Sequence, residues 1–220
     1  MSKIKAVLFD FDGTIMDTNT IILKSWQHTF NTVLGRDPDF EVIKQTFGEP
    51  LDETMAKLFP DRDTHEMVET YRNYQRHIYR DDITMFPGTK ETIEELKRRG
   101  YKVAIVTSRL WSSTTQGLYK FDIADMFDAV VSAEDTTIHK PDPTPILLCL
   151  DKLGIGADEA LMVGDSKFDI LCARNACVKS VLVSWTISVT DEQRAILAPD
   201  YYIQDAAEVL EIVEGEGLAG

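Results

Sequence analysis

The sequence predicts an α/β protein: a doubly wound parallel sheet with an all-helical segment inserted after its first strand. Short apolar runs alternate with amphipathic helical stretches from about residue 84 onward. This alternation is typical of a parallel sheet that is covered by helices on both faces. Residues 19–83 show helical spacing and no strand-like alternation. The chain therefore divides into a core domain, residues 1–18 and 84–220, and a helical cap domain, residues 19–83.

Length and charge limit the possible partners. At 220 residues, the chain is long enough for one domain with an inserted module. Its 23 basic and 37 acidic residues give a net charge of −14. A chain this acidic is repelled by nucleic acids and by anionic membrane surfaces, so we expect neither as a main partner.

The cysteines and the apolar runs indicate a cytoplasmic protein. Cys149, Cys172 and Cys177 form no CxxC motif and no paired framework, so we expect reduced thiols. The apolar run near the N-terminus is too short for a signal peptide, and no stretch approaches the length of a membrane span.

The chain begins with a buried strand and an acidic turn. Residues 6–9 are an apolar run, which is followed by Asp10-Phe11-Asp12-Gly13-Thr14. Gly13 allows a sharp turn, and Thr14 is placed to cap a following helix.

The inserted segment reads as several helices. Apolar spacing predicts helices at 21–33, 51–59 and 64–79, with Gly48-Glu49-Pro50 as a breaker before the second. We expect this segment to act as a lid, with hinges near residues 17–19 and 83–88.

The rest of the chain alternates between helices and strands. Strands are expected at 103–106, 129–131, 161–163, 181–183 and, as an edge, 201–203. Helices are expected at 89–99, 112–119, 144–153, 167–176, 189–197 and 205–213. Residues 214–220 are expected to fray.

Polar and charged residues follow the carboxyl ends of these strands. In open α/β sheets, ligands bind at this edge, so the side chains should converge on one crevice. The members of the set are Asp10, Asp12, Thr107, Ser108, Lys140, Asp165 and Asp169.

A carboxylate cluster of this kind needs a counter-charge, because like charges a few Å apart repel strongly. Mg²⁺, a hard cation that prefers oxygen ligands, is the abundant candidate. Asp165, with the more distant Asp169, would hold it. Asp10 directly follows the strand and is the best-placed nucleophile. Asp12 can then serve as general acid and base.

Two further residues would hold the phosphoryl oxygens. Thr107 and Lys140 would offset the negative charge that spreads over the phosphoryl oxygens in the transition state. The N–H groups of Ser108 and Arg109, at the opening of a helix, would add fixed dipoles.

These residues match a known family. The chain resembles the haloacid dehalogenase-like hydrolase superfamily, in its phosphatase branch with a helical cap after the first strand. The matching motifs are DFDGTIMDT, VTS, HKPDP and GDSKFD. Within the branch, the chain looks closest to the phosphoglycolate phosphatase and pyrophosphatase-like group.

The resemblance implies a Rossmann-like core, Mg²⁺ dependence and an aspartyl-phosphate intermediate. It implies that Asp10 is the nucleophile and Asp12 the acid/base, and that Thr107 and Lys140 bind phosphate. The metal would lie on Asp10, the backbone carbonyl of Asp12 and Asp165, with Asp169 near it.

Substrate choice should depend on the cap loop and its surroundings. Glu49 could pair with a cap lysine or arginine, accept hydrogen bonds from a sugar, or be a solvated loop charge. Arg109 could contact the distal group of the substrate or face the solvent. His139 precedes Lys140 and could line the site.

The leading hypothesis is a Mg²⁺-dependent phosphatase that acts on a small phosphorylated metabolite, as a monomer or weak homodimer. Phosphoglycolate, pyrophosphate and sugar phosphates are the substrate classes considered. The alternatives are a phosphomutase of the β-phosphoglucomutase type and, less well supported, a non-enzymatic phospho-acceptor domain. Such domains are about half this length and have no inserted lid.

Overall fold

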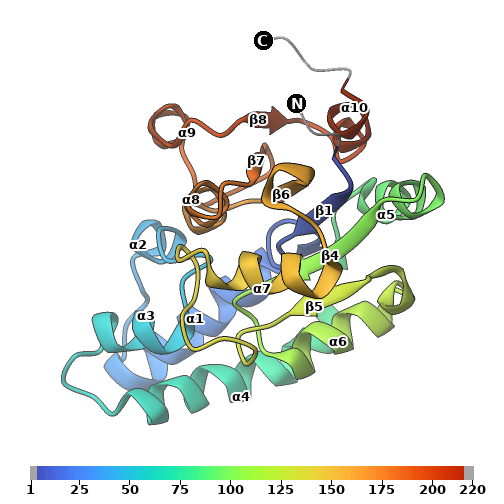
Figure 1. The fold of residues 1–220 in the computed structure, drawn as a ribbon. Helices are drawn as coiled ribbons and strands as arrows, with labels where there is room; N and C mark the ends of the chain where they lie inside the picture. Colours follow the sequence, from blue (N-terminus) through green and yellow to red (C-terminus); the bar gives the residue numbers. More distant parts are fainter. Residues whose placement is uncertain (1–3, 216–220) are drawn as a thin grey trace.

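A six-stranded parallel sheet forms the centre of the molecule (Figure 1). The computed structural model describes residues 4–215, the side chain of Arg80 excepted. In sheet order the strands are β5 (Ala129–Val131), β4 (Lys102–Val106), β1 (Ala6–Phe9), β6 (Ala160–Gly164), β7 (Lys179–Val183) and β8 (Tyr201–Ile203). In chain order of these six strands this is 3-2-1-4-5-6, the doubly wound arrangement with a switch point at the first strand.

Alternate residues of the central strands enter two separate apolar layers. Val7 and Phe9 of β1 belong to one cluster, and Ala6 and Leu8 belong to the other. Helices α5 (Thr89–Arg98), α6 (Trp111–Lys120) and α10 (Glu208–Glu214) contribute to the first layer. Helices α7 (Thr144–Leu153) and α8 (Lys167–Asn175) contribute to the second, and α9 (Asp191–Leu197) packs beside α8. This arrangement confirms the predicted fold class.

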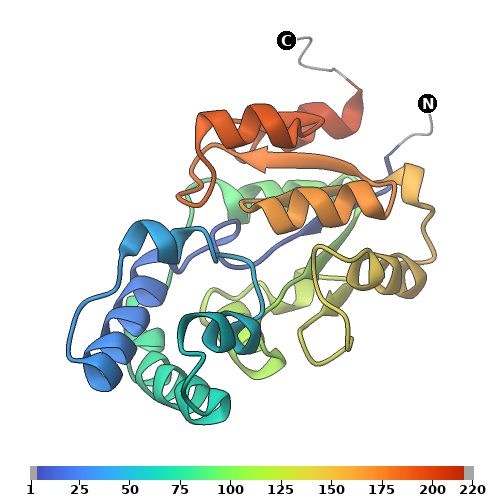
Figure 2. The same cartoon turned by 90° about the vertical axis from the view of Figure 1, so that its left-hand side faces the viewer.

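Four of the helices between β1 and β4 gather on one side of the sheet (Figures 1 and 2). They are α1 (Asn19–Leu34), α2 (Phe40–Lys44), α3 (Leu51–Leu58) and α4 (Thr64–Asp82). They enclose an apolar cluster of their own, which includes Trp26, Phe30, Met55 and Val68. We call this group of helices the cap; its bounds as a domain, residues 19–83, stay a prediction.

A short antiparallel pair joins the cap to the core. Strands β2 (Met16–Asp17) and β3 (Thr84–Met85) pair where the chain enters and leaves the cap. The N–H of Phe86 also donates to the carbonyl of Ile15 at 3.1 Å. Two-residue strands produce no periodic signal, and therefore the sequence did not reveal them.

The expectation that Thr14 caps a helix is wrong. Helix α1 begins only at Asn19, because β2 lies between. The Thr14 hydroxyl is buried and has no hydrogen-bond partner in the described part of the chain. The expected fraying of residues 216–220 lies outside the described residues. Among the helices of residues 4–215, none is both long and apolar enough to cross a membrane.

Core burial predicts the cost of truncating apolar side chains. Leu96 of α5 is fully buried, whereas Leu147 of α7 is 47% exposed. We expect Leu96→Ala to lower the free energy of unfolding by about 2–5 kcal/mol through lost burial and a residual cavity. The matched Leu147→Ala should change it by only about 0.5 kcal/mol. Urea unfolding measures both, and equal losses would contradict the assignment of α5 to the core.

Candidate active site

A cavity of about 190 Å³ lies where the carboxyl edge of the sheet meets the cap. Asp10, Asp12 and Asp165 line it from the core side. Trp26 and Tyr71 line it from the cap. The volume suits a small molecule, since sites for drug-sized ligands are usually several hundred Å³.

Asp10 lies at the buried end of β1. Its backbone N–H donates to the carbonyl of Val163 in β6 at 2.9 Å, which continues the sheet pairing one residue beyond the strand. The side chain is only 3% exposed, and its Oδ1 atom makes no hydrogen bond. That atom nevertheless lies 3.1 Å from the Lys140 Nζ. The carboxylate is thus fixed by the sheet and paired on one side.

Gly13 allows Asp165 to approach the acidic turn. Gly13 has a φ of +74°, a conformation that side chains disfavour. A Cβ built at Gly13 would lie 2.3 Å from Asp165 Oδ2. Only a glycine leaves room for this carboxylate between the turn and the end of β6.

Lys140 and Asp169 form the interior part of the site. Lys140 Nζ donates to Asp169 Oδ1 at 2.6 Å, and both side chains are almost fully buried. The other Asp169 oxygen accepts hydrogen bonds from the Ser166 N–H at 3.0 Å and hydroxyl at 2.6 Å. Because both Asp169 oxygens are occupied, this residue positions Lys140 and the start of α8.

Burial and repulsion alter the proton affinities of this cluster. Burial, followed by the charges of Asp169 and Asp12, raises the pKa of Asp10 to about 7, although Lys140 opposes the shift. Burial and the Asp169 and Asp10 carboxylates raise the pKa of Asp165 as well. For Lys140, burial alone would lower the pKa, but Asp10 and Asp169 raise it above its ordinary value. One ammonium does not offset three buried carboxylates.

The donor set of the cluster fits a divalent cation. Carboxylate oxygens of Asp10, Asp165 and Asp169 all lie within 4.8 Å of one another. The Oδ1 atom of Asp10 accepts no hydrogen bond within the described structure, although the Lys140 ammonium lies 3.1 Å from it. Oxygen donors in this number suit Mg²⁺. The Asp12 carboxylate does not belong to this group of three carboxylates and binds another residue.

That partner is Arg109. Its Nη1 donates to both Asp12 oxygens, at 2.7 and 3.0 Å. The guanidinium carbon also lies 4.4 Å from the ring centre of Tyr79 in the cap helix α4. The Arg109 side chain is only 7% exposed, which contradicts the alternative that it faces the solvent.

Thr107 and Ser108 follow β4 and line the cavity. The Thr107 hydroxyl accepts from the Arg109 N–H at 3.2 Å, and the Ser108 hydroxyl donates to the cap carbonyl of Gly48 at 3.0 Å. Helix α6 begins only at Trp111, so the idea that Ser108 and Arg109 open a helix is wrong.

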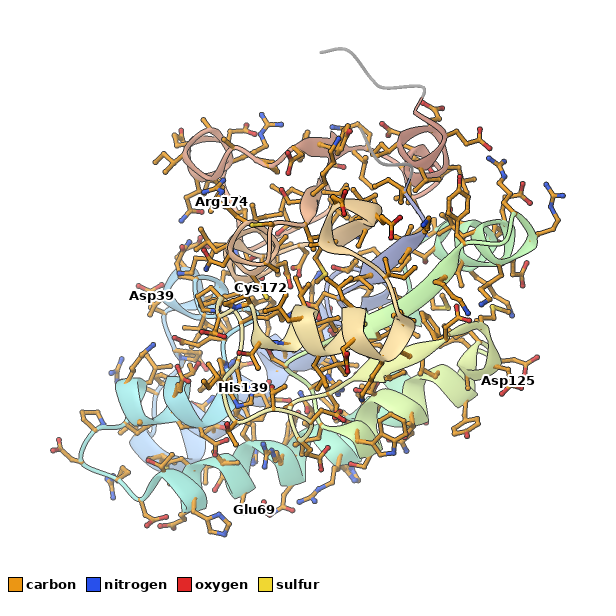
Figure 3. The ribbon with its side chains drawn as sticks, viewed as in Figure 1. Asp39, Glu69, Asp125, His139, Cys172 and Arg174 are labelled. Carbon is orange, nitrogen blue, oxygen red and sulfur yellow. The ribbon has the colours of Figure 1, made fainter. Side chains whose placement is uncertain are left out.

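Glu49 and His139, the other two candidates for specificity, differ in position. Glu49 lines the cavity, accepts from Thr54 Oγ1 at 2.8 Å and pairs with Lys57, which favours the cap-lysine alternative. His139 lies on the loop between β5 and α7 (Figure 3) and is not among the residues that line the cavity.

Several contributors were missed by the sequence analysis. Arg72, Gln75 and Arg76 of α4 line the cavity. Their i, i+3, i+4 spacing beside Tyr71 was the available signal. The hydroxyls of Thr186 and Ser188 donate to the Asp165 carbonyl at 2.6 and 3.1 Å, from a loop that carries no motif.

Comparison with known proteins identifies the family. The family described as "Haloacid dehalogenase-like hydrolase" matches residues 7–183. The chain belongs to the haloacid dehalogenase-like hydrolases. It is a hydrolase of the phosphatase branch, as the family match and the pyrophosphatase-named relatives indicate.

The similar proteins match over nearly the full length. A relative from Caldanaerobacter subterraneus, provisionally named pyrophosphatase PpaX, is 42% identical over 213 residues, covering 97% of this chain and 96% of the relative. Pyrophosphatase PpaX of Halalkalibacterium halodurans is 37% identical, with 96% and 97% covered. A crystal structure from Lactobacillus plantarum, provisionally described as a phosphoglycolate phosphatase, has a TM-score of 0.84 at 25% identity, with 96% and 100% covered.

The buried ion pairs of this haloacid dehalogenase-like hydrolase give a pH-dependent prediction. Lys140→Met leaves buried carboxylates without their counter-charge, so we expect a loss of about 3–5 kcal/mol in the free energy of unfolding at about pH 8. Lys140 lowers the pKa of Asp10, so its removal raises that pKa above the value of about 7 in the intact protein. As the pH falls, the Asp10 carboxyl of the variant takes up a proton and the loss should shrink.

Urea unfolding without divalent cations, at about pH 8 and about pH 5.5, measures the change. Lys152→Met is the matched control, because Lys152 pairs with Asp135 at the surface. An equal loss for Lys140→Met at both pH values would refute the electrostatic explanation.

Proposed function

We propose that the protein is a Mg²⁺-dependent phosphatase that hydrolyses a small phosphorylated metabolite through an aspartyl-phosphate on Asp10. The main support is the pair of carboxylates at the end of β1. Asp10 is buried and ion-paired with Lys140 through an oxygen that accepts no hydrogen bond, and Asp12 lies two residues on in the same cavity. The named relatives support pyrophosphate and phosphoglycolate as substrate classes, beside sugar phosphates.

In the first step, an Asp10 oxygen forms a bond to phosphorus while the bond to the leaving oxygen breaks. Asp12 donates a proton to that leaving oxygen. In the second step, Asp12 takes a proton from water as the water oxygen bonds to phosphorus and the bond to Asp10 breaks. Thr107, Ser108 and Lys140 would hold the phosphoryl oxygens, and Lys140 would also orient Asp10.

The metal site would comprise Asp10, the backbone carbonyl of Asp12 and Asp165, with Asp169 behind them. Bound there, Mg²⁺ would neutralise the carboxylates and offset charge on the phosphoryl group. The buried, mutually repelling carboxylates support this assignment.

The cap, residues 19–83, would close over the substrate and exclude water. Its contacts with the core at Ser108 and its share of the cavity wall support this role. The three cysteines are free, as expected for a protein of the reducing cytoplasm. We expect a monomer or weak homodimer.

Substitution of the two aspartates tests the chemistry. Asp10→Asn should lower phosphate release at least about 1,000-fold, because the nucleophile is lost. Asp12→Asn should lower it by about 100- to 10,000-fold, as expected for loss of general acid–base catalysis. Exposed Asp125 (Figure 3) provides the control Asp125→Asn, which should retain full activity.

The measurement is Mg²⁺-dependent phosphate release from a panel of phosphorylated metabolites. Phosphate release by the Asp10→Asn variant at the wild-type rate would refute the mechanism. Isomerisation of a hexose phosphate with a trace of bisphosphate, without phosphate release, would instead establish the phosphomutase alternative.

Metal binding should be linked to protons. Because the pKa of Asp10 is raised to about 7, a proton competes with Mg²⁺ as the pH falls through that value. Calorimetric titration in two buffers of different ionisation enthalpy measures both quantities. Mg²⁺ should bind more weakly at about pH 6.5 than at about pH 8.5, and its binding should release more protons at about pH 6.5. Asp165→Asn should abolish binding, and unchanged binding by that variant would place the metal elsewhere.

A further inference from the structure

A second cavity, of about 140 Å³, lies where the start of α8 meets α9 (Figure 1). Its lining comes from the first residue of α8, the loop before α9 and α9 itself. The lining residues are Lys167, Ser188, Val189, Gln193, Ile196 and Leu197. None of these residues lines the cavity of the candidate active site. An apolar cavity of about 150 Å³ can hold a benzene-sized molecule, so this one has room for a small ligand.

One wall of this second cavity is apolar. Val189, Ile196 and Leu197 supply its apolar side chains. Ile196 is 82% exposed, the largest exposed fraction among the large apolar side chains of the described chain. Removing apolar surface from water is favourable in proportion to its area. The wall therefore suits an apolar group of a ligand.

Two of the three polar side chains in the lining already have partners. The Ser188 hydroxyl donates to the carbonyl of Asp165 at 3.1 Å. The Gln193 amide donates to the side-chain oxygen of Gln45 in the cap at 2.7 Å, and its own oxygen accepts from the Thr190 N–H at 2.9 Å. Neither side chain therefore needs a ligand to satisfy it.

Lys167 is the third polar side chain, and its charge is not balanced. Its ammonium lies 5.0 Å from the ring centre of Phe168 and makes no ion pair within residues 4–215. No carboxylate of the described chain lines the cavity, although α9 begins with Asp191 and Glu192. Lys167 is half-buried beside an apolar wall, in a chain of net charge −14. An anion can therefore form a charge-assisted hydrogen bond there without competing with a protein carboxylate.

We propose that this cavity is a second ligand site, which binds a small monocarboxylate with an apolar tail. The Lys167 ammonium receives the carboxylate, and the tail lies against Val189, Ile196 and Leu197. An inorganic anion leaves the apolar wall in water, and an alcohol leaves the ammonium without a counter-charge. The size of the cavity suits an aliphatic acid of about five or six carbons.

The ligand site is joined to the cap and to the acidic cluster. Gln193 holds Gln45 at the end of the cap helix α2, and Ser188 holds the carbonyl of Asp165. A ligand that packs against Gln193 and Ser188 restricts both side chains and so stabilises both contacts. Two sites are coupled when a ligand favours one arrangement of the protein over another. Occupation of this site therefore favours the arrangement in which the cap contacts the core.

Binding of hexanoate to the full chain tests the site. Titration calorimetry compares hexanoate with 1-hexanol, which lacks the charge, and with acetate, which lacks the tail. Both should bind at least about 10-fold more weakly than hexanoate, because each omits one part of the recognition. NMR should show the hexanoate-induced shifts at the backbone N–H groups of Val189 and Gln193.

Three variants make the binding result specific. Lys167→Met should weaken hexanoate binding about 10-fold and leave 1-hexanol binding unchanged. Ile196→Ser, at an exposed position, should weaken the binding of both compounds about 3-fold. Lys179→Met is the matched control, because the Lys179 ammonium also lies over a ring, 5.4 Å from the centre of Tyr201, but does not line the cavity.

The coupling is measured by phosphate release. Saturating hexanoate should lower the KM of the wild type about 5-fold, because the contact between Gln193 and Gln45 is stabilised, and it should not change the KM of Lys167→Met. An unchanged KM in the wild type would overturn the coupling to the cap.

Two outcomes would overturn the ligand site itself. One is equal binding of hexanoate by the wild type and by Lys167→Met. The other is a set of NMR shifts at Thr107 and Arg109, with a raised KM, which would place hexanoate in the candidate active site. The binding test does not depend on the proposed function, so a protein that releases no phosphate would refute that function and leave this test valid.

Discussion

Three buried carboxylates share one buried ammonium, and the arrangement of the site depends on this imbalance of charge. Asp10, Asp165 and Asp169 lie within 4.8 Å of one another, and Lys140 contacts two of them. Removing charges from water is costly unless each is paired and hydrogen-bonded. Asp169 satisfies this condition fully, through Lys140 and Ser166, but Asp10 and Asp165 do not. The unsatisfied pair is where a divalent cation would complete the charge balance.

The sheet supplies the rigidity that such a cluster needs. β1 is paired on both sides, to β4 and to β6, so the backbone that carries Asp10 cannot shift alone. Asp165 comes from the end of β6, the direct neighbour of β1, and Gly13 gives it space. Alternation of residues between the two apolar layers fixes the register, because a one-residue slip would reverse every side chain. The position of the site therefore follows from core packing.

Much of the fold and of the candidate site could be predicted from the sequence, and the physical reason differs from residue to residue. Asp10, Asp12 and Asp165 follow apolar runs, and strand ends converge in any parallel sheet. The Asp12–Arg109 contact joins residues far apart in the chain, and no periodic pattern encodes it. For Arg72 and Arg76, the helical spacing indicates a shared polar face, but it does not show which cavity that face meets. The two-residue strands β2 and β3 are below the length at which alternation can be recognised.

The pairing of β2 with β3 also bears on how this molecule can change over evolutionary time. The chain leaves the core and returns to it through adjacent, hydrogen-bonded strands, and the helices between them have their own apolar cluster. Helices in that excursion can lengthen, shorten or exchange their polar faces without altering the spacing of the six core strands. A new ligand preference can thus arise in one part of the chain while the acidic cluster in the other part is preserved unchanged.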